Sequence, residues 1–207
     1  MKIAVVLPTR GIVLTEVLNA LLEELSSYDY KIYMSWNLGI PDGHNTLTKQ
    51  AIMDGYDYIL FIEEDNVIPK GSLKEMLELD GDIVPVDYGV SGWSCITKYK
   101  GEAMWCGLGC TLVKRNVFEA LEYPYFRSDK LLLLNEWPEI KWIDAGNQVY
   151  GGQDIYFCIK AREKGFKITQ ASGESRHLLL DNFGKKETNT GCHRVIDKPR
   201  ISKHNEL

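Results

Sequence analysis

Apolar and polar positions in the first half of the chain alternate between buried runs and helical spacing. An apolar run over residues 2–7 predicts a buried strand, and apolar residues recurring from Val17 to Leu25 predict a helix that begins near Leu14. Further strands are predicted over residues 31–36 and 58–62, with a last one beginning over 82–86; helices are predicted over 46–53 and 72–79. Strands that alternate with helices predict a parallel, Rossmann-like sheet, although the chain has no Gly-x-Gly-x-x-Gly motif.

The pattern changes after Val86 to short, aromatic-rich segments with many glycines, which predict antiparallel or mixed strands. A strand over 107–113 leads into a helix over 115–121, a second helix runs from about Gly152 to Gly165, and residues 166–169 and 175–177 complete the core. We therefore expect an α/β fold, a mixed sheet flanked by helices, as a single domain over 1–183. Its halves are 1–86, which is Rossmann-like, and 87–183, which should build a second binding surface.

Three consecutive acidic residues, Glu63, Glu64 and Asp65, follow the predicted strand 58–62 directly. Side chains alternate along a strand, so Glu63 and Asp65 should project to one side and Glu64 to the other. Two like charges held side by side favour a bound cation, and open α/β sheets bind ligands at the carboxyl ends of their strands. The alternative is a solvated acidic turn before the helix at 72–79.

Composition narrows the class of protein. The 207 residues carry a net charge of −5, which argues weakly against nucleic-acid binding, and no window has the about 18 or more apolar residues of a membrane span. The apolar run at the start of the chain is too short for a secretory signal, so we expect a cytoplasmic protein. The odd number of cysteines, without paired spacing, indicates reduced packing residues: Cys95, Cys106, Cys110, Cys158 and Cys192.

The tail at 184–207 is basic. It could be a mobile flap that closes His193 and Arg194 over an anionic ligand. A solvated, partly disordered terminus is an equal alternative.

Motifs over residues 1–180 together resemble the GT-A glycosyltransferases, in particular glycosyltransferase family 2. In chain order they are Pro8-Thr9-Arg10, Glu63-Glu64-Asp65, Gly107-Leu108-Gly109, Gly152-Gln153-Asp154 and His177. The resemblance implies transfer of a hexose from a nucleotide sugar, UDP- or GDP-linked, to an acceptor hydroxyl. It also implies a divalent cofactor, Mn²⁺ or Mg²⁺, and an inverting displacement by default.

The resemblance assigns roles to some of these residues. Asp65 and His177 would bind the metal, and Asp154 would be the catalytic base. Glu63 stands where the family has Asp, so its expected contact is with ribose or metal-bound water, while Glu64 is expected to be structural. From the residues alone, His177 could equally be structural, and Asp154 could be a helix N-cap.

Other residues are expected at the donor. Pro8, Thr9 and Arg10 would meet the base and ribose, and Gly107 would let a ligand approach the backbone. The same pocket could be lined by Asp42, Asn45 and Lys49, although for Lys49 a solvated helix surface is slightly favoured. Aromatic side chains could stack on sugars or belong to the core: Tyr88, Trp93, Trp105 and Trp137.

Two rival functions remain open. A sugar-nucleotide nucleotidyltransferase would need a Gly-x-Gly-x-Arg loop, which the sequence after residue 7 does not supply. The second rival is a catalytically inactive protein that binds a sugar or a nucleotide. The motif Gln-x-x-Arg-Trp is absent, so polysaccharide synthesis is not expected. The sequence identifies neither the donor sugar nor the acceptor.

Overall fold

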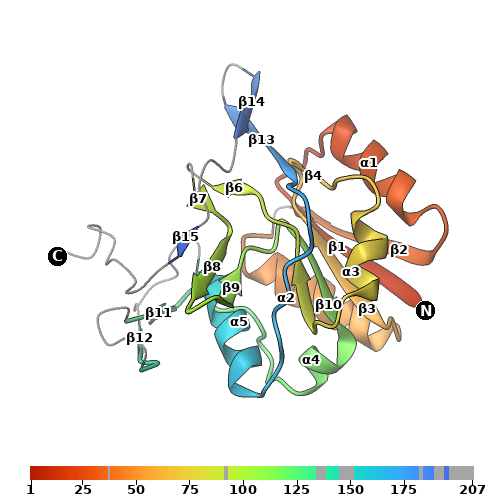
Figure 1. Cartoon of the computed structure of the whole chain (residues 1–207). Helices are drawn as coiled ribbons and strands as arrows, with labels where there is room; N and C mark the ends of the chain where they lie inside the picture. The colour runs from red at the N-terminus through yellow and green to blue at the C-terminus, as the bar shows by residue number, and fades with distance from the viewer. Residues whose placement is uncertain are drawn as a thin grey trace.

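A five-stranded mixed sheet forms the centre of the molecule (Figure 1). The computed structural model describes residues 1–36, 38–90, 93–133, 139–144, 152–181, 184–188 and 194–195. The strand order is β2-β1-β3-β10-β5, in which β1 pairs in parallel with β2 and β3, and β10 runs antiparallel to β3 and β5. The strands are β1 (Lys2–Thr9), β2 (Asp29–Trp36), β3 (Tyr58–Ile62), β5 (Ile83–Pro85) and β10 (Cys110–Lys114). The expected mixed α/β fold is confirmed.

Helices cover both faces of this sheet because the side chains of each strand alternate between two cores. On β1, Val5 packs with the apolar residues of α1 (Thr15–Leu25) and α3 (Ser72–Glu78). Its neighbour Val6 belongs to the opposite core, together with residues of α2 (Asp42–Met53), α4 (Arg115–Glu119) and α5 (Gln153–Glu163). Both faces of the sheet are therefore buried, which accounts for the continuous apolar runs of β1 and β3.

The second half builds short antiparallel pairs, as the sequence predicts. These are β6 (Gly89–Val90) with β7 (Trp93–Ser94), β8 (Ile96–Tyr99) with β9 (Glu102–Cys106), and β11 (Lys130–Leu132) with β12 (Trp142–Asp144). A further sheet joins β4 (Asn66–Val67), β13 (Arg176–Asp181) and β14 (Gly184–Thr188). Within the basic tail, β14 pairs with β13, and β15 (Arg194–Val195) pairs in parallel with β8.

Several predicted boundaries were wrong. Helix α2 begins at Asp42 rather than residue 46, since Pro41 precedes its first turn and Gly43 lies close against β2, where a Cβ would be 3.0 Å from Ser35 Oγ. Strand β10 begins only at Cys110. Residues 166–169 make no strand but a single bridge between Ile83 and Ile168. The predicted sites at Trp137, Cys192 and His193 lie outside the described residues.

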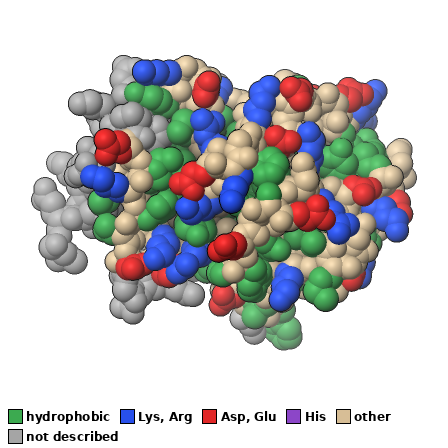
Figure 2. Space-filling model, turned by 90° about the horizontal axis from the view of Figure 1, so that it is seen from below, with side chains coloured by type: hydrophobic (Ala, Val, Ile, Leu, Met, Phe, Trp, Pro, Cys, Tyr) green, Lys and Arg blue, Asp and Glu red, His purple; other side chains and the backbone are tan. Residues whose placement is uncertain are grey.

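The structure shows how charged side chains and cysteines are distributed. On the face seen in Figure 2, basic and acidic side chains are interspersed rather than gathered by sign. No helix in the described part of the chain is both long and apolar enough to cross a membrane. The four cysteines of the described segments are free and buried: Cys95, Cys106, Cys110 and Cys158.

Candidate functional site

The acidic residues lie where β3 leaves the sheet, at its carboxyl end. The backbone there is fixed from two sides. The N–H of Glu63 donates to the carbonyl of Gly109 at 3.1 Å, and the N–H of Leu178 donates to the carbonyl of Asp65 at 2.7 Å. The turn therefore sits between the entrance of β10 and strand β13, which brings residues far apart in sequence to one place.

Glu63, Asp65 and His177 converge there. Each offers one ligand atom, and these atoms lie within 4.8 Å of one another. His177 is delivered by β13, where it stands opposite Asn66 in the strand pairing. This arrangement brings together the two predicted metal ligands and Glu63, for which a contact with the metal, with ribose or with metal-bound water was expected.

The imidazole of His177 is oriented by a backbone group. Its Nδ1 lies 2.8 Å from the carbonyl of Gly89, and its Nε2 lies 3.5 Å from Asp65 Oδ1. When Nδ1 carries the proton that this carbonyl accepts, the lone pair of Nε2 points toward the carboxylates. Proteins commonly orient a histidine ligand by letting its other ring nitrogen donate a hydrogen bond to a group such as a backbone carbonyl.

The electrostatics favour a cation at this point. Burial, reinforced by the charges of Asp65 and Asp154, raises the pKa of Glu63 to about 7. Burial alone would lower the pKa of His177, but the hydrogen bonds with Asp65 and Gly89 and the nearby carboxylate charges raise it. Glu63 therefore resists ionising beside Asp65, and a positive charge at this point would stabilise its ionised form.

Glu64 binds the end of β1 instead. Its Oε2 accepts hydrogen bonds from Thr9 Oγ1 at 2.7 Å and from the backbone N–H of Arg10 at 2.8 Å, and its Oε1 pairs with Arg10 Nε. Glu64 thus ties the end of β1 to the end of β3. Thr9 and Arg10 are thereby held beside the acidic cluster, where donor contacts are expected.

Asp154 is the second residue of α5 and not its N-cap. The cap position is held by Gly152, whose φ of 84° is one that glycine adopts readily. Asp154 Oδ1 accepts the N–H of Ile155 at 2.8 Å, and burial raises the pKa of the carboxyl to about 6. The charge of Asp154 also raises the pKa of Glu63, so the two acids are within electrostatic reach.

Other predicted donor residues are engaged elsewhere. Asn45 is buried, and its amide exchanges hydrogen bonds of 2.8 and 3.0 Å with the backbone of Phe126. Lys49 places its Nζ 4.8 Å from the ring centroid of Tyr123. Asp42 is exposed in the first turn of α2, where a negative charge is favourable. The amide of Asn45 is therefore occupied by the Phe126 backbone, and the ammonium group of Lys49 lies over the ring of Tyr123.

Gly107 permits a close approach, but to a side chain of the protein. A Cβ there would lie 2.2 Å from Tyr88 Oη, and this hydroxyl accepts the N–H of Gly109. Pro8 is buried in β1 beside Ser35. Among the aromatic candidates, Tyr88 and Trp105 belong to the core, whereas Trp93 is 53% exposed.

Sequence reasoning missed a buried histidine. His44 is 1% exposed between the rings of Phe61 and Phe126, and neither of its ring nitrogens has a partner among the described residues. Burial lowers the pKa of His44 to about 4, so the ring is neutral near pH 7. Its place in the first turn of α2 was hidden because the helix was predicted to begin after it.

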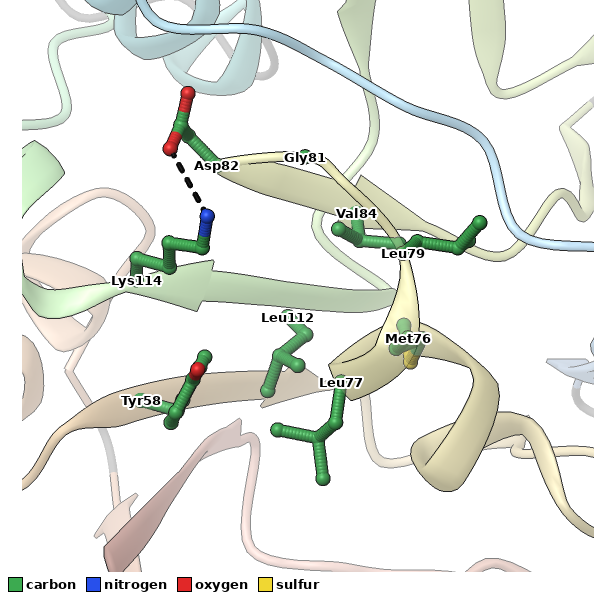
Figure 3. A pocket seen from close by; sticks show the side chains of 9 residues that line it. All are labelled: Tyr58, Met76, Leu77, Leu79, Gly81, Asp82, Val84, Leu112 and Lys114. Carbon is green, nitrogen blue, oxygen red and sulfur yellow. Dashed lines mark hydrogen bonds and ion pairs between the residues drawn. The ribbon is translucent and has the colours of Figure 1, made fainter. Parts of the chain in front are cut away.

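A small cavity lies away from this chemistry (Figure 3). Tyr58, at the other end of β3, lines it with Met76, Leu112 and Lys114. Its volume of about 10 Å³ is room for roughly one water molecule. The acidic cluster, and not this cavity, is the candidate functional site.

Comparison with known proteins shows the fold but no family. No family model matches the chain, and no curated protein sequence does. The crystal structure of A197 from STIV is similar over 99% of this chain and 100% of that one, with a TM-score of 0.61 and 19% identity. This likeness shows a shared fold, and the class defined so far is an α/β protein with a mixed sheet and an acidic site at its carboxyl edge.

The solved structures that resemble the chain more weakly include a glycosyltransferase and a nucleotidyltransferase. One is a glycosyltransferase involved in the glycosylation of the major capsid of PBCV-1, with a TM-score of 0.38 and 13% identity over 66% of this chain and 71% of that one. The other is the inositol-1-phosphate CTP transferase from T. maritima, with a TM-score of 0.39 and 12% identity over 75% and 61%. These likenesses are too slight to assign an activity, and membership of glycosyltransferase family 2 stays a prediction.

Proposed function

We propose that this protein transfers a sugar from a nucleoside diphosphate sugar to an acceptor hydroxyl, using Mn²⁺ or Mg²⁺. The observation that carries the proposal is the convergence of Glu63, Asp65 and His177 at the carboxyl edge of the sheet, with Asp154 in electrostatic reach. Ligands of α/β sheets bind at this edge.

The residues fit a hard divalent cation. Two carboxylates and an imidazole offer ligand atoms within 4.8 Å of one another, and the imidazole is oriented by the Gly89 carbonyl. Carboxylates suit Mg²⁺ and Mn²⁺, and the imidazole favours Mn²⁺ of the two. When bound, such a metal stabilises the negative charge that develops on a departing diphosphate.

Asp154 is suited to take the proton of the attacking hydroxyl. Its carboxyl has a pKa raised to about 6, so it is mostly ionised at pH 7 and is a stronger base than an ordinary aspartate. The hydrogen bond from the N–H of Ile155 fixes one oxygen, which leaves the other for the acceptor. General-base catalysis of this kind contributes typically ~10²–10⁴-fold to the rate.

Thr9 and Arg10 are the residues that we assign to the donor side, because both bind Glu64 next to the acidic cluster. The backbone and Nε of Arg10 are held by Glu64, and the side chain is 73% exposed, so the guanidinium is accessible to an incoming phosphate. Arginine pairs with phosphate through two parallel hydrogen bonds. UDP- and GDP-sugars are the donors to test first.

The test is thermal unfolding of the wild-type protein with UDP-sugars and GDP-sugars, each with and without Mn²⁺. A bound ligand raises the unfolding temperature, so one nucleotide sugar should do so only with the metal. Asp65→Asn should lose this shift, whereas Asp154→Asn should keep it and lose sugar transfer. Asp144→Asn, which removes an exposed carboxylate paired with Lys130, is the matched control and should behave as wild type.

Analysis of the product separates the rival reaction. A glycosyltransferase releases a nucleoside diphosphate, whereas a nucleotidyltransferase acting on a nucleoside triphosphate releases pyrophosphate. If no nucleotide shifts the unfolding temperature with the metal present, or if Asp154→Asn retains substantial transfer, the proposal is wrong.

A further inference from the structure

Arg10 is the basic residue that links the structural carboxylate of the acidic cluster to one of the metal-binding carboxylates. Its Nε pairs with Glu64 Oε1, and its Nη2 lies 3.9 Å from Asp65 Oδ2. The other oxygen of Asp65 faces His177 Nε2 at 3.5 Å. Each oxygen of this proposed metal ligand therefore lies beside a nitrogen of the protein.

The contacts of Arg10 with Glu64 and with Asp65 differ in how firmly they hold. Glu64 is 5% exposed and also accepts the backbone N–H of Arg10, so the attachment to Glu64 is partly built into the backbone. The pair with Asp65 is longer than a hydrogen bond, and the side chain of Arg10 is 73% exposed. The guanidinium can therefore leave Asp65, which is itself buried, without breaking a hydrogen bond between them.

A divalent cation and the guanidinium cannot both be neighbours of Asp65 without repelling each other. A cation that binds alone must overcome this repulsion or displace the guanidinium. A cation that arrives with a diphosphate brings negative charge, which the guanidinium can bind with two parallel hydrogen bonds. The position of Arg10 therefore weakens binding of the metal alone and favours binding of metal and diphosphate together.

We propose that Arg10 is an internal counter-ion of the metal site, which pairs with Asp65 when no metal is bound and turns to the donor diphosphate when the metal binds. This inference rests on the proposed function, because it needs a metal at Asp65. It makes Arg10 a positioning residue that couples the two ligands, and such coupling is reciprocal: each ligand must tighten the other by the same factor.

The experiment measures binding of Mn²⁺ from the signal of free Mn²⁺ in electron paramagnetic resonance, with and without UDP or GDP, at low ionic strength. Low salt is needed because exposed charges are screened. Arg10→Gln should bind Mn²⁺ alone about two- to fivefold more tightly than wild type, the range expected for loss of an exposed charge. In the same variant the tightening of Mn²⁺ by nucleoside diphosphate should fall at least about fivefold.

Two further variants control for charge. Arg10→Lys keeps the positive charge but not the planar fork, so its affinity for Mn²⁺ alone should return toward wild type while the coupling stays weak. Lys74→Gln removes one positive charge from an exposed pair on α3, 3.8 Å from Glu78, and should change neither quantity. Thermal unfolding confirms that each variant is folded, as expected because Thr9 and the Arg10 backbone still bind Glu64.

The outcomes distinguish the two proposals. If Mn²⁺ binds wild type but not Asp65→Asn, and Arg10→Gln binds it no more tightly, the role of Arg10 is overturned while the metal site stands. If wild type binds no Mn²⁺ with or without diphosphate, both proposals fail. Tighter binding of the metal alone together with lost coupling supports the role of Arg10.

Discussion

Asp154→Asn should make the protein more stable. The pKa of this carboxyl rises on folding from 3.8 to about 6, because burial disfavours the charged form. A difference of about 2 pKa units corresponds to ~3 kcal/mol of folding free energy lost when the group ionises. Asp154 is only half-buried, so solvent reduces this figure, and we expect about 1–2 kcal/mol. Asparagine still accepts the N–H of Ile155, so the helix start is preserved.

The sign of the pH dependence follows from the direction of the pKa shift. Between pH 3.8 and about 6 the folded protein binds more protons at Asp154 than the unfolded chain does, so this group lowers stability as the pH rises. Urea unfolding of wild type and Asp154→Asn should therefore show a stability difference that is small at pH 4, grows to pH 6 and is constant above pH 7.

Asp54→Asn is a matched control for which the opposite change in stability is expected. The pKa of exposed Asp54 is lowered to about 2, first by the hydrogen bond from Tyr33 and then by those from Lys31 and Gln50. Asp54→Asn should accordingly destabilise the protein at pH 7. If Asp154→Asn is no more stable than wild type at pH 7.5, or if its advantage does not shrink on acidification, then Asp154 is not held in the environment described here.

The remaining predictions concern the pH dependence of the reaction, a buried histidine and a tightly packed glycine. The rate of sugar transfer should fall below about pH 6 as Asp154 is protonated, which a pH–rate profile at saturating donor measures. Wild type should lose up to ~3 kcal/mol of stability as the pH falls from 6.5 to about 4, because the unfolded chain accepts a proton that the buried His44 resists. His44→Phe should remove this loss in urea unfolding across the same range. If the ring were accessible, wild type and variant would show the same pH dependence. Gly107→Ala should cost about 1–3 kcal/mol, because its Cβ would lie 2.2 Å from Tyr88 Oη. Gly39→Ala, where a Cβ meets nothing within 4 Å, should be neutral in the same thermal unfolding assay.

The core elements could be predicted because burial leaves a direct mark on the sequence. Strand β3 spans the predicted residues Tyr58–Ile62, since its run of apolar residues lies between helices on both faces. Boundaries set by a few polar or glycine residues could not be predicted in this way. Helix α2 begins four residues early because packing at Gly43, which involves a distant strand, decides its first turn.

Part of the candidate site could also be predicted. The expectation that Glu63 and Glu64 meet different groups agrees with the structure, in which Glu63 joins Asp65 and His177 while Glu64 binds Thr9. The approach of His177 depends on the pairing of β13 with β4, and nothing local in the sequence specifies that register. Asn45 was expected to line the donor pocket. Its role, two hydrogen bonds to the Phe126 backbone, depends on a segment about eighty residues away.

The acidic residues of the candidate site differ in how far hydrogen bonds and basic groups of the protein compensate their negative charge. Glu64 accepts hydrogen bonds from Thr9 and from the backbone and side chain of Arg10, so its charge is compensated by the protein itself. Glu63 and Asp154 have raised pKa values, which means that ionising them costs stability in the folded state. Carboxylates that the fold leaves uncompensated mark positions where an external positive charge or a proton is expected during function. Under the proposed function, this contrast in compensation, more than the acidity of the sequence, assigns Glu64 to the framework and Glu63 and Asp154 to the chemistry.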